Sequence, residues 1–157
     1  MATKGGPVRT ICLCATVAAL YTALTLLTQA ISFGPVQLRV AEALTLLPVL
    51  FPPAGYGLAL GCLLSNLLGS ATPWDVVFGT LATLIAAMLT VRLRRNIWLA
   101  ALPPVLVNAV VISLVLRFTL ADALLLPTAL SIAAGQAVAV YGLGVPLVKA
   151  LEKLKIW

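Results

Sequence analysis

Histidine is absent from this 157-residue sequence, and charged residues make up only 9% of it. A soluble domain carries roughly 25% charged residues, so this chain cannot cover its surface with polar groups and most of it must face lipid. Without histidine the chain lacks the commonest metal ligand and the usual base of a Ser-His or Cys-His catalytic unit. We therefore do not expect an enzyme, and we expect no catalytic residues, no metal site and no cofactor.

Nucleotide and nucleic-acid binding are also not expected. The sequence has no G-x-x-x-x-G-K-[ST] motif, so the chain should not bind and hydrolyse a nucleotide as P-loop proteins do. The formal net charge is +6, from ten Lys plus Arg against four Asp plus Glu. However, the basic residues flank apolar runs and do not form one face interleaved with aromatic residues, so no nucleic-acid partner is predicted.

Hydrophobic residues make up 62% of the chain and fall into six runs. A membrane-spanning helix needs about 20 apolar residues. Helix is the expected conformation because backbone groups that face lipid must be paired within their own segment. We predict an all-α integral membrane protein with one membrane domain, residues 1–157, and approximate spans at 11–31, 41–51, 54–68, 76–91, 97–116 and 123–148.

The second run is short. Its residues would cover about 17 Å as an α-helix, against a hydrocarbon core about 30 Å thick. Two interpretations stay open: residues 41–51 form a short buried span, or they form a re-entrant hairpin with residues 54–68. The turn between the two runs carries no charged residue, so the positive-inside rule does not distinguish the two interpretations.

The positive charges predict the orientation. If the N-terminus is cytoplasmic and all six runs cross, only Arg39 and Arg117 of the ten Lys and Arg lie on the opposite side. This distribution fits the positive-inside rule and places both termini in the cytoplasm. The predicted cytoplasmic cations are Lys4, Arg9, Arg92, Arg94, Arg95, Lys149, Lys153 and Lys155.

Polar residues in or near the spans gather toward the predicted non-cytoplasmic side. Ionisable groups are costly to bury in a membrane, so they usually face a cavity or each other. A carboxylate such as Glu42 accepts two hydrogen bonds from a flat N–H-bearing edge, amides both donate and accept, and aromatic rings provide stacking faces. We predict a pocket for a polar small molecule, lined by Gln37, Arg39, Glu42, Asn66, Trp74, Asp75, Asn108, Gln136 and Tyr141.

Structural roles compete with several of these assignments. Arg39 and Glu42 are three residues apart and could form only a salt bridge. Asp75 is placed where an N-cap carboxylate of the fourth run would lie. Asn108 and Gln136 could hydrogen-bond between helices. Tryptophans near the span ends could be anchors at the membrane interface.

Small residues recur on one face of the first run. Ala15, Ala19 and Ala23 are spaced four residues apart, which allows another helix to approach closely. The neighbouring helix could belong to this chain or to a partner protein, and the spacing does not separate these two cases.

One motif in the sequence is specific: Gln-x-Arg-x-x-Glu-Ala-Leu-Thr, which begins at Gln37 and lies within residues 32–48. It is accompanied by residues 61–69 with Asn66, 75–83, 102–108, and Gly135-Gln136 through Tyr141 to Pro146. Together these segments resemble the QueT family over nearly the whole chain.

This resemblance implies the substrate-binding S component of an energy-coupling factor (ECF) transporter, an ABC-type importer of a queuosine precursor. The precursor would be a 7-deazaguanine such as its 7-cyano or 7-aminomethyl derivative, or queuine. The family implies a multi-pass protein of a prokaryotic plasma membrane that captures the precursor on the outer side and works with a transmembrane T component and two ATPase subunits.

The same resemblance implies roles for particular residues. The polar residues named above become candidate precursor ligands, with Glu42 or Asp75 accepting from the N1–H and 2-amino edge. The stripe Ala15, Ala19 and Ala23 becomes the candidate docking face for the T component.

Other functions are kept as alternatives. The chain could be an S component for another vitamin, or an ion-coupled secondary transporter of a small polar heterocycle. The latter would need coupling-ion ligands and often has an internal repeat. The few carboxylates and the lack of a repeat make it the weaker hypothesis, and a structural scaffold without a ligand is a third.

Overall fold

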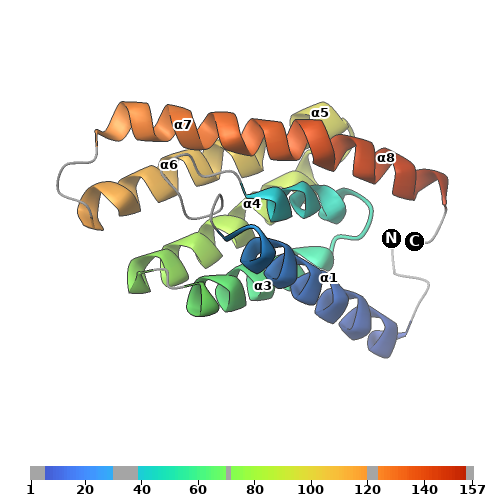
Figure 1. Ribbon diagram of the computed structural model, residues 1–157. Coiled ribbons are helices and arrows are strands. Elements are labelled where there is room, and N and C mark those ends of the chain that lie inside the picture. The colour runs from blue at the N-terminus through green and yellow to red at the C-terminus, as the bar shows by residue number, and fades with distance from the viewer. Residues whose placement is uncertain (1–5, 30–38, 70–71, 120–123, 155–157) are drawn as a thin grey trace.

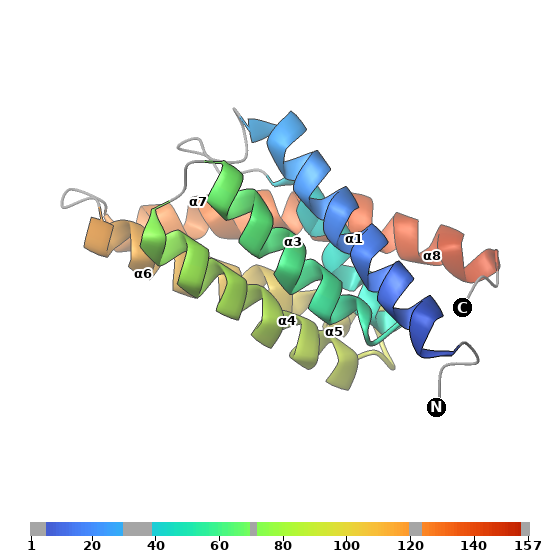
Figure 2. The same ribbon diagram turned by 90° about the horizontal axis from the view of Figure 1, so that it is seen from below.

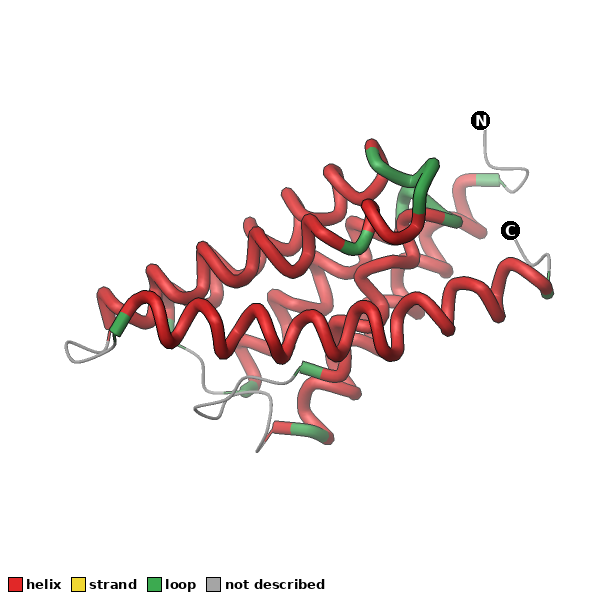
Figure 3. Tube along the Cα trace, turned by 90° about the horizontal axis from the view of Figure 1, so that it is seen from above, coloured by secondary structure: helices red, strands yellow, loops and turns green. Residues whose placement is uncertain are grey.

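The computed structural model describes residues 6–29, 39–69, 72–119 and 124–154. Within these residues the chain is helical, with short turns and no strand (Figure 3). The predicted all-α fold is therefore confirmed for the part of the chain that the structure describes. In order, the elements are α1 (Pro7–Leu27), η1 (Val40–Val49), α3 (Ala54–Leu68), η2 (Asp75–Gly79), α4 (Thr80–Arg92), α5 (Ile97–Ala100), α6 (Leu102–Thr119), α7 (Leu125–Ala137), η3 (Val138–Gly144) and α8 (Val145–Lys153).

Four helical segments are long and apolar enough to cross a membrane. Two of them contain a π-helical turn: η2 leads directly into α4, and η3 joins α7 to α8 as one long helix (Figure 1). The two shorter apolar helices, η1 and α3, correspond to the second and third predicted runs. The four long segments are Pro7–Leu27, Asp75–Arg92, Ile97–Thr119 and Leu125–Lys153.

The helices run between two ends of one bundle. Figure 2 shows α1 beginning and α8 ending at one end, where α4 also ends. At the other end α1 and α3 end and α7 begins. In the same view α1, α3 and α4 lie side by side, and the packing of α1 on α3 and of α3 on α4 agrees with it.

The short helix η1 lies at the centre of the bundle, between the α1–α3 pair and the long α7–α8 helix (Figure 1). It is a 3₁₀ helix, and every residue from position 41 to position 48 is buried. A 3₁₀ helix rises about 2.0 Å per residue, so its ten residues extend about 20 Å. A buried interior position is common to both interpretations of this run, the short buried span and the re-entrant hairpin.

Three residues per turn give η1 three distinct faces. Leu44 and Leu47 lie on one face and pack in the apolar cluster with α1 and α3. Leu46 lies on a second face and packs in the cluster with α5, α6 and η3. Glu42 and Thr45 lie on the third face and are buried polar residues. Because the first two faces are fully occupied by apolar packing, the polar face is fixed in orientation.

Two glycines allow helices to approach η1 and α1 closely. A Cβ atom at Gly61 of α3 would lie 2.8 Å from the Ala18 carbonyl oxygen and 2.8 Å from the Cβ of Tyr21, both on α1. A Cβ atom at Gly144 of η3 would lie 2.8 Å from the carbonyl oxygen of Ala43 on η1. The absence of a side chain at each position therefore sets the spacing of the helices that surround Glu42.

Candidate functional site

The candidate site is centred on the carboxylate of Glu42, which is 1% exposed. The Tyr21 hydroxyl donates a hydrogen bond to Oε1 at 2.7 Å. Nδ2 of Asn108 donates to Oε2 at 3.3 Å. The side chain of Gln136 is a further hydrogen-bonding neighbour of the carboxylate. Four helices therefore converge on one buried carboxylate.

Each of these side chains comes from a different helix. Tyr21 lies on the buried face of α1, and Glu42 lies on the polar face of η1. Asn108 and Gln136 lie in the middle of α6 and near the end of α7, and both are buried. A buried charge is costly unless donors surround it, and these three donors provide that environment.

Two buried amide oxygens of the predicted site residues have no hydrogen-bond partner among the residues that the structure describes. They are Oδ1 of Asn66 and Oε1 of Gln136. Both side chains are at least nine-tenths buried. Nearly all buried polar atoms in proteins are hydrogen-bonded, so two unpaired buried acceptors need a specific explanation. Donors supplied by a bound small molecule would satisfy them.

Arg39 brings a positive charge to this region. It is the N-cap residue of η1 and is 5% exposed. Its guanidinium is close enough to the carboxylates of Glu42 and Asp75 for electrostatic interaction. The site therefore combines a buried cation, a buried anion and amide groups, which together suit a polar heterocycle with both donors and acceptors.

Asp75 has a local structural role. Its Oδ2 accepts hydrogen bonds from the backbone N–H and the hydroxyl of Thr72, at 3.1 and 2.8 Å. The backbone N–H of Asp75 donates to the Thr72 hydroxyl at 3.2 Å. This reciprocal pair is a capping box, in which Thr72 is the N-cap and Asp75 is the third helical residue. The helix is therefore capped at Thr72, three residues before the N-cap position expected at Asp75, and the Thr72-x-x-Asp75 spacing is the sequence signal for it.

Asp75 nevertheless touches the candidate site through its backbone. Its carbonyl oxygen accepts a hydrogen bond from Nδ2 of Asn66 at 3.1 Å. Nδ2 of Asn66 also lies 3.5 Å from Sγ of Cys62. The start of η2 therefore holds the Asn66 amide so that its oxygen is the atom left without a partner.

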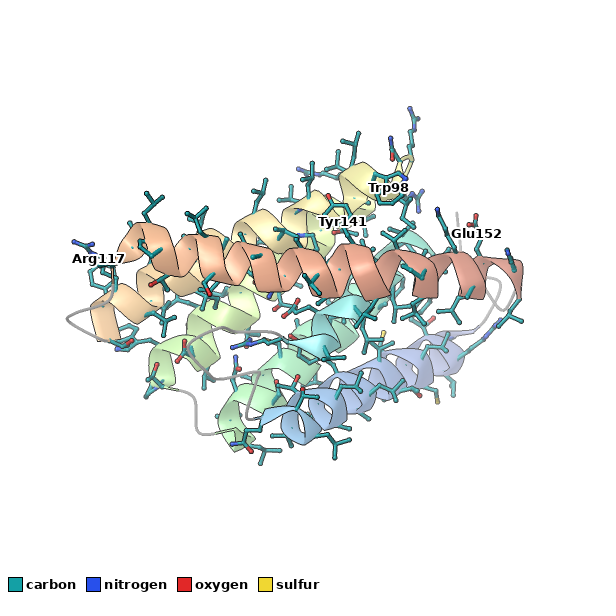
Figure 4. All side chains as sticks on the ribbon, turned by 45° about the horizontal axis from the view of Figure 1, so that its top comes forward. Trp98, Arg117, Tyr141 and Glu152 are labelled. Atoms are coloured by element: carbon teal, nitrogen blue, oxygen red, sulfur yellow. The ribbon has the colours of Figure 1, made fainter. Side chains whose placement is uncertain are left out.

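Of the two aromatic candidates, Trp74 is exposed and Tyr141 is half-buried. Trp74 is 59% exposed and stacks on Phe78, with ring centroids 5.9 Å apart. Tyr141 stacks on Trp98 at 6.0 Å, and its hydroxyl donates to the Trp98 carbonyl oxygen (Figure 4). The structure thus brings Arg39, Glu42, Asn108 and Gln136 together, whereas the Asn66 amide contacts Cys62 and the start of η2, and the two rings lie away from this cluster. Gln37 lies outside the described residues.

Tyr21 was not among the predicted site residues. In the sequence it is an aromatic residue in the middle of an apolar run, where a packing role is the default interpretation. A signal was present, because a buried tyrosine hydroxyl usually needs a hydrogen-bond partner. The sequence has only four Asp and Glu residues, and one of their carboxylates is a natural acceptor for the Tyr21 hydroxyl. Hydropathy alone does not identify which of the four it is.

The alanine stripe of α1 is exposed. Ala15, Ala19 and Ala23 face away from the bundle, whereas Ala18 is buried against α3 beside Gly61. Within the described residues the stripe is therefore not used for packing inside this chain.

Comparison with known proteins identifies the family. The chain is 42% identical over 81 residues to a protein described as queuosine precursor transporter QueT, from Lactococcus lactis subsp. cremoris. That alignment covers 50% of this chain and 47% of the relative, so it spans about half of each. No solved structure matches the chain. The family model for the QueT transporter matches residues 11–153, so the chain belongs to the QueT transporter family, whose members are transporters and not enzymes.

Proposed function

We propose that this chain is the S component of an ECF-type importer and captures a queuosine precursor, a 7-deazaguanine, at the Glu42 site. The observation that carries the proposal is the buried Glu42 carboxylate, together with the unpaired buried oxygens of Asn66 and Gln136. The family membership and the name of the Lactococcus relative support the same class of ligand.

The chemistry of a 7-deazaguanine complements these groups. Its N1–H and 2-amino group form a flat edge with adjacent donors, which a carboxylate accepts with both oxygens. The ring carbonyl oxygen is an acceptor that an amide N–H or the Arg39 guanidinium would satisfy. Glu42 is favoured over Asp75 as the partner of the donor edge, because its carboxylate is buried where side chains of α1 and α6 meet, whereas the Asp75 carboxylate caps the helix start at Thr72.

The exposed stripe on α1 supports a partner in the membrane. Small residues four apart allow two helix backbones to approach closely. In lipid, helices associate through such close packing because there is no hydrophobic driving force between them. We assign Ala15, Ala19 and Ala23 to the docking face for the T component. The sequence holds no P-loop motif, so the energy of ATP hydrolysis must come from partner chains. We assign this role to two ATPase subunits.

The proposed orientation places the Asp75 end of the bundle on the outer side of a prokaryotic plasma membrane, so that the precursor reaches the central Glu42 site from that side. Arg92, Arg94 and Arg95 are exposed at the opposite end, where α4 ends. This arrangement agrees with the positive-inside rule and lets the precursor enter from outside.

Uptake in proteoliposomes tests the proposed function. The chain is reconstituted alone, and together with a T component and two ATPases, and uptake of radiolabelled 7-aminomethyl-7-deazaguanine is measured with and without ATP. Uptake that needs both the partners and ATP is expected. Uptake by the chain alone along an ion gradient would contradict the S-component assignment.

Binding specificity is measured separately by calorimetry with 7-deazaguanines, riboflavin and thiamine. We expect submicromolar or tighter binding of a 7-deazaguanine. Tight binding of riboflavin or thiamine without binding of a 7-deazaguanine would reject the precursor assignment and leave a vitamin S component.

A further inference from the structure

A second site lies at the other end of the bundle from Asp75. A groove of about 410 Å³ opens between α3 and α4 and reaches the turn that precedes α3. Apart from one arginine, its walls are apolar or small residues. The groove is lined by Pro52, Pro53, Gly55, Tyr56, Leu84, Ala87, Met88, Val91 and Arg92.

The groove exists because small residues form its floor. A Cβ atom at Gly55 of α3 would lie 3.1 Å from the Cβ of Ala87 on α4, so the two helices come close there. Neither residue has a side chain that fills the seam above the contact. Tyr56 and Met88 are 72% and 54% exposed, so they border the groove without closing it.

Arg92 gives the groove a charged end. It is the last residue of the membrane-spanning segment Asp75–Arg92, and it is exposed. Arg94 and Arg95 follow in the next turn and are also exposed. Of the three acidic residues that the structure describes, Asp75 lies at the far end of the bundle and Glu42 is buried at its centre, whereas Glu152 is exposed on α8, which ends at the same end as α4. The three exposed arginines outnumber this one carboxylate, so the end of the groove carries an excess of positive charge.

The depth of the lining residues matches the layers of a membrane. A helix rises 1.5 Å per residue, so Met88 and Leu84 lie about 6 and 12 Å from Arg92 along α4. With Arg92 at the level of the headgroups, these two side chains lie at the level of the acyl chains. The apolar part of the groove therefore lies next to the exposed Arg92 guanidinium, on the side toward the centre of the bilayer.

We propose that this groove binds a phospholipid with an anionic headgroup. The headgroup phosphate pairs with the Arg92 guanidinium, and one acyl chain lies along Leu84 and Met88 over the Gly55–Ala87 floor. Arginine suits this contact because its planar fork donates two hydrogen bonds to phosphate oxygens. The apolar walls explain the need for an acyl chain, and the charge at the end explains the preference for an anionic lipid over a zwitterionic one.

Native mass spectrometry of the purified chain tests the proposal. The protein is equilibrated in detergent with equal amounts of phosphatidylglycerol and phosphatidylcholine, and bound lipid is counted. We expect a phosphatidylglycerol adduct that survives activation better than any phosphatidylcholine adduct. Arg92→Gln should weaken the phosphatidylglycerol adduct about fivefold, which corresponds to one basic residue at a membrane surface.

Matched variants separate the groove from general surface effects. Arg94→Gln removes an equal charge outside the groove lining, and it should change the adduct much less than Arg92→Gln. Met88→Trp fills the groove and should remove the adduct, whereas Ile85→Trp, on an exposed part of α4 outside the lining, should not.

Three results would overturn the proposal. They are equal retention of both lipids, equal losses in Arg92→Gln and Arg94→Gln, and equal losses in the two tryptophan variants. Each variant is first checked for binding of 7-aminomethyl-7-deazaguanine, or for its unfolding temperature if the precursor does not bind, so that a misfolded protein is not scored as a loss of lipid.

Discussion

The Tyr21 hydroxyl on α1 donates a 2.7 Å hydrogen bond to Oε1 of Glu42 on η1, and both side chains are buried. This contact joins the helix that carries the exposed alanine stripe to the helix that carries the central carboxylate. The position of α1 therefore determines one of the donors that surround Glu42.

Tyr21→Phe tests how much this hydrogen bond contributes to the stability of the fold. The change removes a donor from a buried carboxylate and leaves the ring packing in place, so the free energy of unfolding should fall by about 1–3 kcal/mol. Denaturant unfolding in detergent measures the change. Tyr56→Phe is the control because Tyr56 is 72% exposed, and it should have almost no effect. Equal effects of the two variants would show that the Tyr21 hydroxyl contributes nothing specific.

Gly61→Ala tests whether close packing of α1 on α3 positions Tyr21. The new Cβ would meet the Ala18 carbonyl oxygen and the Tyr21 Cβ, each at 2.8 Å, so α1 must shift. We expect a lower unfolding temperature and weaker precursor binding. Gly142→Ala is the matched control, because a Cβ atom there meets nothing within 4 Å. Alanine is favoured over glycine in a helix by about 0.5–1 kcal/mol, so the control should be neutral or stabilising.

Asp75→Ala separates a capping role from a ligand role. Loss of the capping box should lower the free energy of unfolding by about 0.5–2 kcal/mol, and Thr72→Ala should have a similar effect. The Kd of the precursor should not change in either variant. A large increase in Kd for Asp75→Ala, but not for Thr72→Ala, would instead assign the donor edge of the ligand to Asp75.

Ala19→Leu tests the docking face on α1. The bulky side chain should prevent close approach of a partner helix, so co-purification with the T component should be lost while precursor affinity stays the same. Ala150→Leu is a control at an exposed alanine of α8 and should leave assembly intact. Retained assembly in Ala19→Leu would show that the T component docks elsewhere.

Much of the fold could be predicted from the sequence, because long apolar runs in a membrane have few alternatives to helix. The described helices α3 and α6 fall on runs three and five, and η1 falls on run two. Hydropathy could not predict that η1 is a 3₁₀ helix, since that form depends on how its three faces pack against α1, α3 and η3.

The candidate site was predictable only in part. Glu42, Asn108 and Gln136 stand out as polar residues in apolar runs, and the structure brings them together although Glu42 and Asn108 are 66 positions apart. Tyr21 could not be separated from ordinary packing aromatics, because its role depends on the angle at which α1 meets η1. Trp74 and Tyr141 lie at the surface, where their stacking partners are Phe78 and Trp98.

The most direct test of the account is the Kd of 7-aminomethyl-7-deazaguanine for the purified chain and for its Glu42→Gln variant, measured by calorimetry. Glu42→Gln keeps the size of the side chain but replaces one acceptor oxygen with a donor and removes the charge. Because hydrogen bonds to a charged group contribute about 1.5–3 kcal/mol, the Kd should rise about 10- to 100-fold. Glu152→Gln, in an exposed position on α8, should bind like the unchanged protein. An unchanged Kd in Glu42→Gln would contradict the claim that this carboxylate holds the precursor.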